Sequence, residues 1–241
     1  MPDVRGPYGL KIIQSCVACP VREQGLFCNL GPQALQELNS LRQASVYPAG
    51  AVLFVEGQSA RGLFILCSGK AKLSTSSPQG RAVIVRVAEA GEVLGLSAVV
   101  STVPYEVSAQ TLEPAEVNFL PRADFLRFLQ SYGEVALRVA QHLSLELRRA
   151  YNQVARIALA PSARAKLAGL LLDWADRDAQ PASKGVRFQL LLTHEEIGEL
   201  IGSSRETVTR LLSEFRRRGL IQIKGSFITL ADSNKLKSIL A

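Results

Sequence analysis

Histidine, the commonest general base of enzymes, is scarce in this chain. Of 241 residues only two are histidines, His142 and His194, and neither lies near a nucleophile or a carboxylate cluster with catalytic spacing. Acid–base and nucleophilic catalysis both need such groupings. The sequence therefore predicts a protein that is not an enzyme, with a cysteine-based redox enzyme as a distant alternative.

Long apolar runs are also absent. The chain shows no N-terminal run of signal-peptide type, no span as long as a membrane helix and no solenoid repeat. We therefore expect a cytoplasmic protein with no membrane partner. In that compartment the four cysteines are expected to be free, metal-bound or redox-active rather than joined in structural disulfides.

Acidic residues are outnumbered by basic ones. The chain has 28 Lys and Arg against 21 Asp and Glu, a formal net charge of +7. Much of this excess is local, because the segment 203–225 holds six basic residues and two acidic ones. A basic segment of this kind fits a polyanionic partner such as nucleic acid.

The segment Leu192–Gly219 reads as two helices joined by a tight turn. Thr193 is a good N-cap, and Glu196 three residues later completes a capping box. Gly202 supplies the permissive backbone that a sharp turn needs. The second helix has an apolar stripe at helical spacing. The stripe consists of Val208, Leu211, Leu212 and Phe215.

The face opposite this stripe carries residue types that recognise DNA bases. The second helix begins at Ser203 or Ser204, and its polar face consists of Arg205, Glu206, Thr209 and Arg210. Arginine binds guanine in a fork geometry, and glutamate accepts a hydrogen bond from the cytosine amino group. The pattern matches a helix-turn-helix whose second helix enters the major groove. The alternative is an ordinary solvated pair of helices.

Two short apolar-alternating runs, 220–223 and 227–230, flank Lys224, Gly225 and Ser226 and predict a hairpin, or wing. The run IGELIGSSRETVTRLLSEFRRRGLIQIKGSFITL resembles the winged helix-turn-helix of the Crp/Fnr family of bacterial transcription regulators. The resemblance implies double-stranded DNA and RNA polymerase as partners, and a palindromic site with TGTGA-like half-sites. The DNA-binding residues that it implies are Ser203, Ser204, Arg205, Glu206, Thr209, Arg210 and Lys224.

From Ala44 to about Pro121 the chain reads as short strands separated by glycine turns, which predicts an antiparallel sandwich or barrel. PAGAVLFVEG and the segment that ends at Gly95 resemble the cyclic-nucleotide-binding β-roll of the same family. Members that bind cyclic nucleotides carry a Glu and an Arg where this chain has Leu96 and Val107. A buried phosphate needs a charged partner. We therefore expect no cyclic AMP, and either an apolar effector or a packed scaffold.

The segment Arg122–Leu159 predicts helix with a break near residues 131–133. Its long part carries apolar residues at spacings of three or four, which suits a coiled-coil seam. The proposed seam is Val135, Val139, Leu143, Leu147, Ala150, Val154 and Ile157. Packing against its own β-roll is the alternative. The family resemblance implies a homodimer through this helix, with two recognition helices one turn of DNA apart.

Three cysteines, Cys16, Cys19 and Cys28, lie in the N-terminal segment at spacings that suit zinc or an iron–sulfur cluster. The resemblance to Fnr-like members implies a [4Fe–4S] cluster with a fourth cysteine late in the roll, where this chain has Ala115. Cys67, in the apolar run LFILCSG, is the other thiol, and it is either a small buried apolar residue or a further candidate metal ligand. Three interpretations remain: a cluster with an unusual fourth ligand, a thiol redox or zinc site, and a segment without a ligand.

Together these features predict an α+β chain in four parts. They are a cysteine-containing segment (1–31), a β-roll sensor domain (32–132), a dimerisation helix (133–159) and a winged helix-turn-helix domain (160–241). The predicted protein is a homodimeric, sequence-specific regulator controlled by a signal at its N-terminal domain. The signal is redox, oxygen or nitric oxide in the cluster interpretation. The alternatives are constitutive binding, thiol oxidation and a ligand other than a cyclic nucleotide.

Overall fold

The computed structural model describes residues 7–10, 13, 15–17, 19, 25–77, 82–159, 162–178, 180–181 and 185–240, without the side chains of 152–153, 155–159, 177–178 and 180–181. The chain forms two compact units, Met1–Leu147 and Arg148–Ala241. No described helix is both long and apolar enough to span a membrane.

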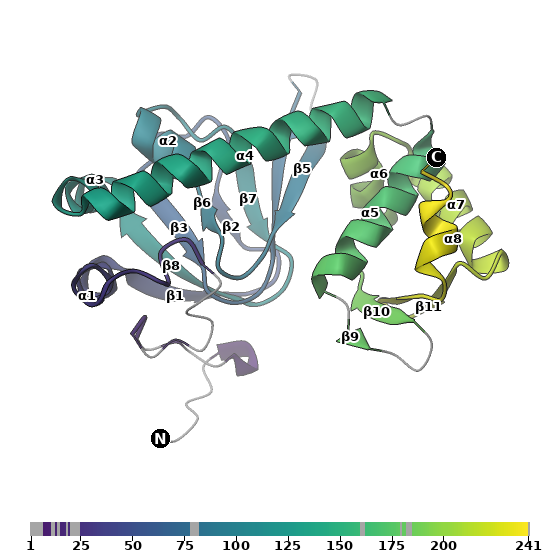
Figure 1. The fold of residues 1–241 in the computed structure, drawn as a ribbon, viewed down its shortest axis with the longest axis horizontal. Helices are drawn as coiled ribbons and strands as arrows, with labels where there is room; N and C mark the ends of the chain where they lie inside the picture. Colours follow the sequence, from purple (N-terminus) through teal and green to yellow (C-terminus); the bar gives the residue numbers. More distant parts are fainter. Residues whose placement is uncertain are drawn as a thin grey trace. The chain divides into compact units, whose positions relative to one another are not determined.

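The N-terminal unit is built on two four-stranded antiparallel sheets (Figure 1), with strand orders β1-β8-β3-β6 and β2-β7-β4-β5. This architecture confirms the predicted β-roll. Its strands are β1 Gln43–Tyr47, β2 Val52–Phe54, β3 Gly62–Leu66, β4 Ala71–Ser76, β5 Ala82–Ala88, β6 Val93–Leu94, β7 Ser108–Thr111 and β8 Ala115–Pro121. Its helices are the 3-10 turn η1 Pro7–Gly9, α1 Pro32–Leu41, α2 Leu96–Ser101, α3 Arg122–Ser131 and the start of α4 Gly133–Leu159.

Aromatic rings fill the space between the two sheets. Phe54 stacks on Tyr105 with ring centroids 4.2 Å apart and on Phe64 at 5.4 Å. The Tyr105 hydroxyl donates to the Gly62 carbonyl at 2.5 Å, which satisfies the one polar atom of this buried ring. The interior of the roll is therefore a packed apolar core.

A second core lies where α1, α3 and the start of α4 pack against β3 and β8. Val135 and Val139 of α4 are buried in it, and Leu143 packs on its edge. The predicted seam was therefore wrong in its first half, because these three residues contact the chain's own β-roll. The side chain of Ile157, the last predicted seam position, lies outside the described residues.

A different face of α4 exposes apolar side chains. Leu137, Leu147, Tyr151 and Val154 are 61%, 55%, 67% and 65% exposed. The helix thus carries two apolar stripes. A step of four residues falls about 40° beyond a full helical turn. Residues spaced four apart, starting at Val135, therefore move gradually around the helix from the buried stripe to the exposed one.

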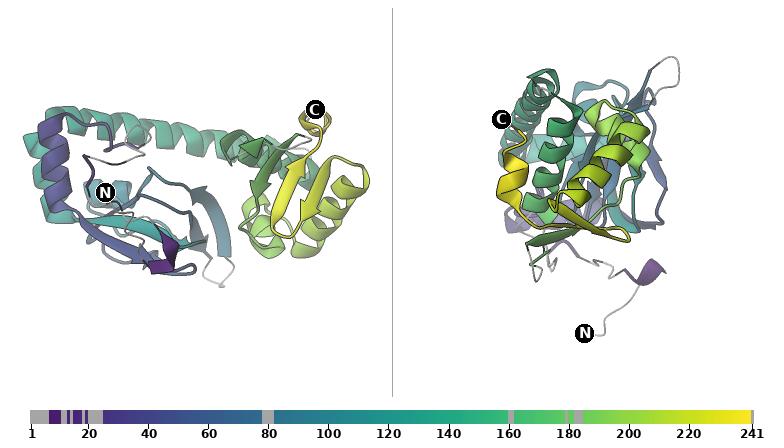
Figure 2. Two further views of the ribbon diagram at one scale, coloured as in Figure 1. Left: turned by 90° about the horizontal axis from the view of Figure 1, so that it is seen from below. Right: turned by 90° about the vertical axis from the view of Figure 1, so that its right-hand side faces the viewer.

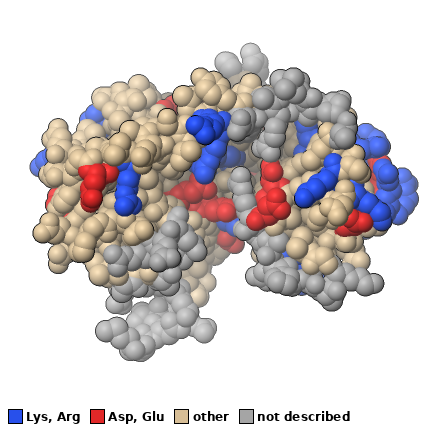
Figure 3. Space-filling view, in the orientation of Figure 1, with Lys and Arg blue, Asp and Glu red and all other residues tan. Residues whose placement is uncertain are grey.

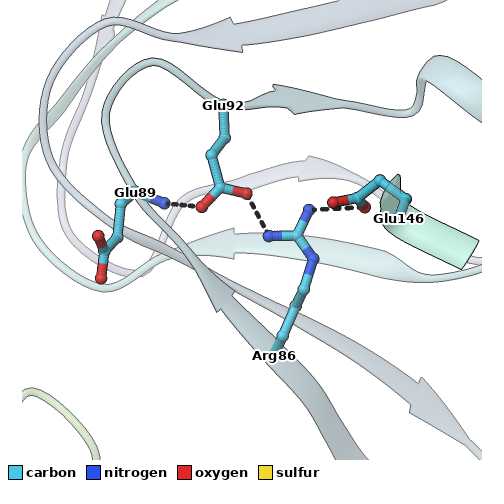
Figure 4. Close-up of polar contacts among 4 residues, drawn as sticks. All are labelled: Arg86, Glu89, Glu92 and Glu146. Carbon is cyan, nitrogen blue, oxygen red and sulfur yellow. Dashed lines mark hydrogen bonds and ion pairs between the residues drawn. The ribbon is translucent and has the colours of Figure 1, made fainter. Parts of the chain in front are cut away.

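An arginine on β5 joins the roll to α4 (Figure 4). The Arg86 guanidinium binds the Glu92 carboxylate, and it lies 3.4 Å from the Glu146 carboxylate on α4. Glu92 also accepts a hydrogen bond from the Glu89 backbone N–H at 3.1 Å. These partly buried charges hold the middle of α4 against the edge of the roll.

The C-terminal unit packs helices against a four-stranded antiparallel sheet of order β11-β12-β10-β9 (Figure 2). Its helices are α5 Ala163–Asp178, α6 His194–Ile201, α7 Arg205–Arg217 and α8 Ser233–Lys237. Its strands are β9 Gln180–Pro181, β10 Val186–Gln189, β11 Ile221–Lys224 and β12 Phe227–Leu230. Strands β11 and β12 form the predicted hairpin, with Lys224 paired to Phe227 beside the turn.

Candidate functional site

The first helix of the pair, α6, begins with the predicted capping box. The Thr193 hydroxyl accepts from the Glu196 backbone N–H at 3.2 Å, and the Glu196 carboxylate accepts from the Thr193 N–H at 2.8 Å. Gly202 ends the helix with φ +67°, the left-handed conformation that glycine adopts without strain. The chain then turns sharply toward α7.

A second glycine, Gly198, also makes this turn possible. A Cβ atom at Gly198 would lie 2.7 Å from the Ser203 carbonyl oxygen, which is closer than real Cβ contacts come. The turn can therefore pack on α6 only where α6 has no side chain. This role was not predicted from the sequence, although a glycine inside a helical pattern was the available signal.

The second helix, α7, starts at Arg205 with Ser204 as its N-cap. The Ser204 hydroxyl accepts from the Thr207 backbone N–H at 3.3 Å. The predicted apolar stripe is buried as expected: Val208, Leu211, Leu212 and Phe215. The opposite face exposes all four predicted base-reading residues: Arg205, Glu206, Thr209 and Arg210.

His194 contacts one of these side chains, Thr209, and this contact was not predicted from the sequence. The Thr209 hydroxyl donates to the Arg205 carbonyl at 2.9 Å, and its oxygen lies 2.8 Å from His194 Nδ1. When the hydroxyl proton is on the Arg205 carbonyl, His194 Nδ1 is the donor to the Thr209 oxygen. The Thr209 methyl group is then the part left for a base.

Glu206 is held in its ionised form. Its own backbone N–H and the Ser204 hydroxyl lower the pKa of the carboxyl group, and the charge of Arg205 adds to the effect. Only the ionised carboxylate has both oxygens available as acceptors. Glu206 therefore presents the state that can accept a hydrogen bond from a cytosine amino group.

Basic side chains surround this face. Lys224 is exposed beside the hairpin turn, and Arg216 and Arg217 are exposed in the last turn of α7. Figure 3 shows Lys and Arg gathered at the edge of the C-terminal unit where α7 lies. Arg218 also faces solvent, but it pairs with Glu214 at 3.3 Å. Arg205, Glu206, Thr209 and Arg210 thus lie exposed on one face of α7, and Lys224 is exposed at the hairpin that follows.

The four cysteines gather in the N-terminal unit. Burial, and then the charges of Cys19 and Cys16, raise the pKa of the Cys28 thiol to about 11. Burial raises the pKa of Cys67 as well, followed by the charges of Glu116 and of the three other cysteines. Burial raises the pKa of Cys16, opposed by Arg42 and reinforced by Cys19. Each sulfur therefore lies near enough to the other three to act on them electrostatically.

A chain of hydrogen bonds links Cys16 to Cys67 through one arginine. The Cys16 backbone N–H and Arg42 Nε both donate to Asn39 Oδ1, at 2.9 and 3.0 Å. Arg42 Nη1 donates to Asn118 Oδ1 at 2.8 Å. The other end of that amide, Asn118 Nδ2, donates to Cys67 Sγ at 2.9 Å.

The same arginine helps to fix the N-terminal segment. Both oxygens of the fully buried Glu116 carboxylate accept from the Ile13 N–H, at 3.0 and 2.9 Å. Arg42 Nη2 donates to the Ile13 carbonyl at 3.2 Å. Burial raises the pKa of Glu116, while the Ile13 N–H and Arg42 oppose the shift.

The donor set fits a cluster better than a single ion. Among the described residues, no three Cys, His, Asp or Glu side chains are placed to share one metal ion. Zinc at about 2.3 Å from each sulfur would require sulfurs roughly 4 Å apart. The four partly buried thiols match in number the four cysteine ligands that a [4Fe–4S] cluster takes.

The two positions that the family resemblance assigns to cyclic-nucleotide contacts belong to the apolar packing here. Leu96 is buried in the core beneath α1 and α3, and Val107 packs against the core between the sheets. Neither side chain offers a charge or a hydrogen bond to a phosphate group.

Comparison with known proteins agrees with both units. Residues 44–132 match the family model of the cyclic nucleotide-binding domain, and residues 165–239 match that of the Crp-like helix-turn-helix domain. A CRP-like cAMP-activated global transcriptional regulator of Mycobacterium tuberculosis is 28% identical over 212 residues, covering 88% of this chain and 94% of the relative.

Two further relatives are similar over most of their length. The fumarate nitrate reduction regulatory protein of Klebsiella oxytoca is 25% identical over 225 residues, covering 93% of this chain and 89% of the relative. The crystal structure of a CRP-family transcriptional regulator from Thermus thermophilus has a TM-score of 0.69 at 26% identity, covering 81% of this chain and 96% of that one. The two domains match in the order in which they follow one another along the chain, and the relatives are regulators of the same kind. The chain therefore belongs to the Crp/Fnr family of DNA-binding transcription regulators.

Proposed function

We propose that the protein is a homodimeric regulator that binds a palindromic DNA site with TGTGA-like half-sites. The observation that carries the proposal is the polar face of α7, where Arg205, Glu206 and Arg210 are exposed opposite a buried apolar stripe. The two arginines each bind a guanine and Glu206 a cytosine. Thr209 contacts a base through its methyl group. Ser203, Ser204 and Lys224 contact the phosphate backbone.

The second copy of the chain packs along the exposed stripe of α4. The stripe runs through Leu137, Ala140, Ser144, Leu147, Tyr151 and Val154. Its steps alternate between three and four residues, the spacing of a two-stranded coiled coil. A dimer of this kind places two recognition helices about 34–36 Å apart on one face of the DNA. RNA polymerase is the further partner that we propose.

The regulatory signal acts at the N-terminal cysteines. Cys16, Cys19 and Cys28 would hold an iron–sulfur cluster, which would supply a redox centre sensitive to oxygen or nitric oxide. Arg42 and Asn39 fix the segment around Cys16. A thiol switch is disfavoured, because a reactive sensor cysteine needs a lowered pKa and burial raises the pKa of Cys16, Cys28 and Cys67. Cyclic AMP is disfavoured by Leu96 and Val107.

We propose that the chain divides into four functional parts. Residues 1–31 carry the cysteines, 32–132 form the sensor roll, 133–159 the dimerisation helix and 160–241 the DNA-binding domain. The signal changes the balance between two dimer geometries, of which one fits adjacent major grooves.

Selection from a pool of random duplex DNA, with protein purified without oxygen, tests the DNA-binding proposal. We expect enrichment of a two-fold symmetric site with TGTGA-like half-sites. The Arg205→Ala variant, run in parallel, should lose the preference at one base pair of each half-site. Recovery of unenriched sequences by the wild-type protein would instead indicate a winged domain that binds another protein.

A further inference from the structure

We propose that Cys67 is the fourth cysteine ligand of the cluster site, and that Asn118 positions its sulfur. This inference rests on the proposed iron–sulfur cluster. It assigns the ligand to the end of strand β3, whereas the family resemblance points to the start of β8.

The fold brings Cys67 to the N-terminal cysteines. Cys67 directly follows β3, and its backbone N–H donates to the Glu116 carbonyl on β8 at 2.8 Å. Its side chain packs on the same apolar core as the side chain of Cys16. Phe27, the neighbour of Cys28, is buried in that core too. Three segments that are distant in sequence therefore pack on one core.

The start of β8 cannot supply the ligand. Ala115 is fully buried in the other core, between the two sheets, among Leu66 and Val117. Side chains alternate between the faces of a strand. Glu116 and Asn118 therefore lie on the opposite face of β8 from Ala115. That face is the one that contacts Ile13 and Cys67.

Asn118 and Arg42 supply two of the contacts that a thiolate ligand at Cys67 needs. Thiolate ligands give a cluster a negative charge, and a partly buried negative charge needs hydrogen bonds and a nearby cation. Asn118 Nδ2 donates to Cys67 Sγ at 2.9 Å, and Arg42 holds the other end of the amide at 2.8 Å. The Asn118 side chain is only 1% exposed, so its orientation is fixed by these two bonds.

Gly25 keeps room for the third ligand. A Cβ atom at this position would lie 2.6 Å from Cys28 Sγ and 2.9 Å from the Gly91 carbonyl oxygen. Any larger residue at position 25 would therefore displace the Cys28 sulfur or the neighbouring backbone.

The test is the iron and sulfide content of full-length Cys67→Ala, purified and reconstituted without oxygen beside the wild-type protein. Wild type should hold about four iron and four sulfide per chain, and the variant at least about tenfold less. Val17→Ala, an exposed position beside Cys16, is the matched control and should keep the wild-type content. Cys67→Ser preserves the size of the side chain. Should Cys67→Ala fail to fold, as judged by circular dichroism, the same loss of iron is expected in Cys67→Ser.

The outcomes separate the two proposals. If wild type binds no iron, the proposed cluster fails, and the assignment of Cys67 fails with it. If wild type binds the cluster and both folded Cys67 variants keep the same content and the same absorption and electron paramagnetic resonance spectra, only the assignment of Cys67 is overturned.

The reduction potential of the cluster in the Asn118→Val variant tests the positioning role, because replacing a residue with a purely structural role would not change it. Hydrogen bonds to cluster sulfurs stabilise the reduced, more negative state. Loss of the Asn118 bond should therefore make the reduction potential more negative while the iron content stays at the wild-type level. An unchanged potential at full iron content would contradict the positioning role.

Discussion

Arg205 lies at the start of α7, exposed on the face that carries Glu206. Replacement by alanine should weaken binding to the cognate site by about 1–3 kcal/mol, because a forked contact to one guanine is lost. Fluorescence anisotropy with the cognate duplex and with single-base variants measures the effect. In the Arg205→Ala variant, the preference for one base over the others should be lost at one base pair of each half-site. The Arg216→Ala variant, in the last turn of the same helix, should bind all DNA sequences more weakly to the same extent. A uniform loss in Arg205→Ala would mean that Arg205 contacts only phosphate.

The Cys28 thiol of cluster-free protein should react slowly at neutral pH. Burial, with the charges of Cys19 and Cys16, raises the pKa of Cys28 to about 11, so its reactive thiolate is scarce at pH 7 and increases as the pH rises toward that value. Alkylation of Cys28 by iodoacetamide at pH 7, followed by mass spectrometry, should be at least about tenfold slower than that of a free cysteine. Fast alkylation at pH 7 would revive the thiol-switch interpretation.

Single residues also show what the sequence could reveal and what it could not. Local rules predicted Thr193 and Glu196 as a capping box, because both partners lie within one helical turn. The proposed ligand role of Cys67 depends on which face of β8 contacts the N-terminal segment. His194 on α6 contacts Thr209 on α7. Both contacts join side chains on different elements, which helical or strand periodicity does not report.

At the scale of elements, the turn between α6 and α7 depends on Gly198. Gly198→Ala should destabilise the C-terminal unit by about 1–3 kcal/mol, since the added carbon would meet the Ser203 carbonyl at 2.7 Å. Gly169→Ala on α5 is the matched control, because its Cβ would meet only Leu240 at 3.6 Å. That change should be neutral or stabilising by up to about 1 kcal/mol. Urea unfolding of both variants measures the difference, and equal stabilities would contradict the close approach at Gly198.

The long helix α4 shows where element-scale prediction failed. Its extent and its apolar character were evident from the sequence. Two stripes, one buried on the β-roll and one exposed, were merged because residues of both recur at spacings of three or four. Only the packed structure separates Val139, which contacts the roll, from Leu147, which faces solvent.

At the scale of the whole molecule, the exposed stripe of α4 should form the dimer. Leu147→Glu places a charge in the stripe and should shift the protein toward monomers at micromolar concentration, as measured by sedimentation. Leu145→Glu is the matched control, since Leu145 is 50% exposed but lies outside the stripe. It should remain dimeric. A dimeric Leu147→Glu, or equal dissociation of the two variants, would place the interface elsewhere.

The most direct test of the whole proposal joins the cysteine site to DNA binding. Iron and acid-labile sulfide are measured on protein purified without oxygen, and its affinity for the selected palindrome is measured before and after exposure to air. We predict stoichiometric iron and sulfide, and an affinity that changes as the cluster is lost. Protein that contains no iron and binds the palindrome equally tightly before and after air would contradict control by an iron–sulfur cluster.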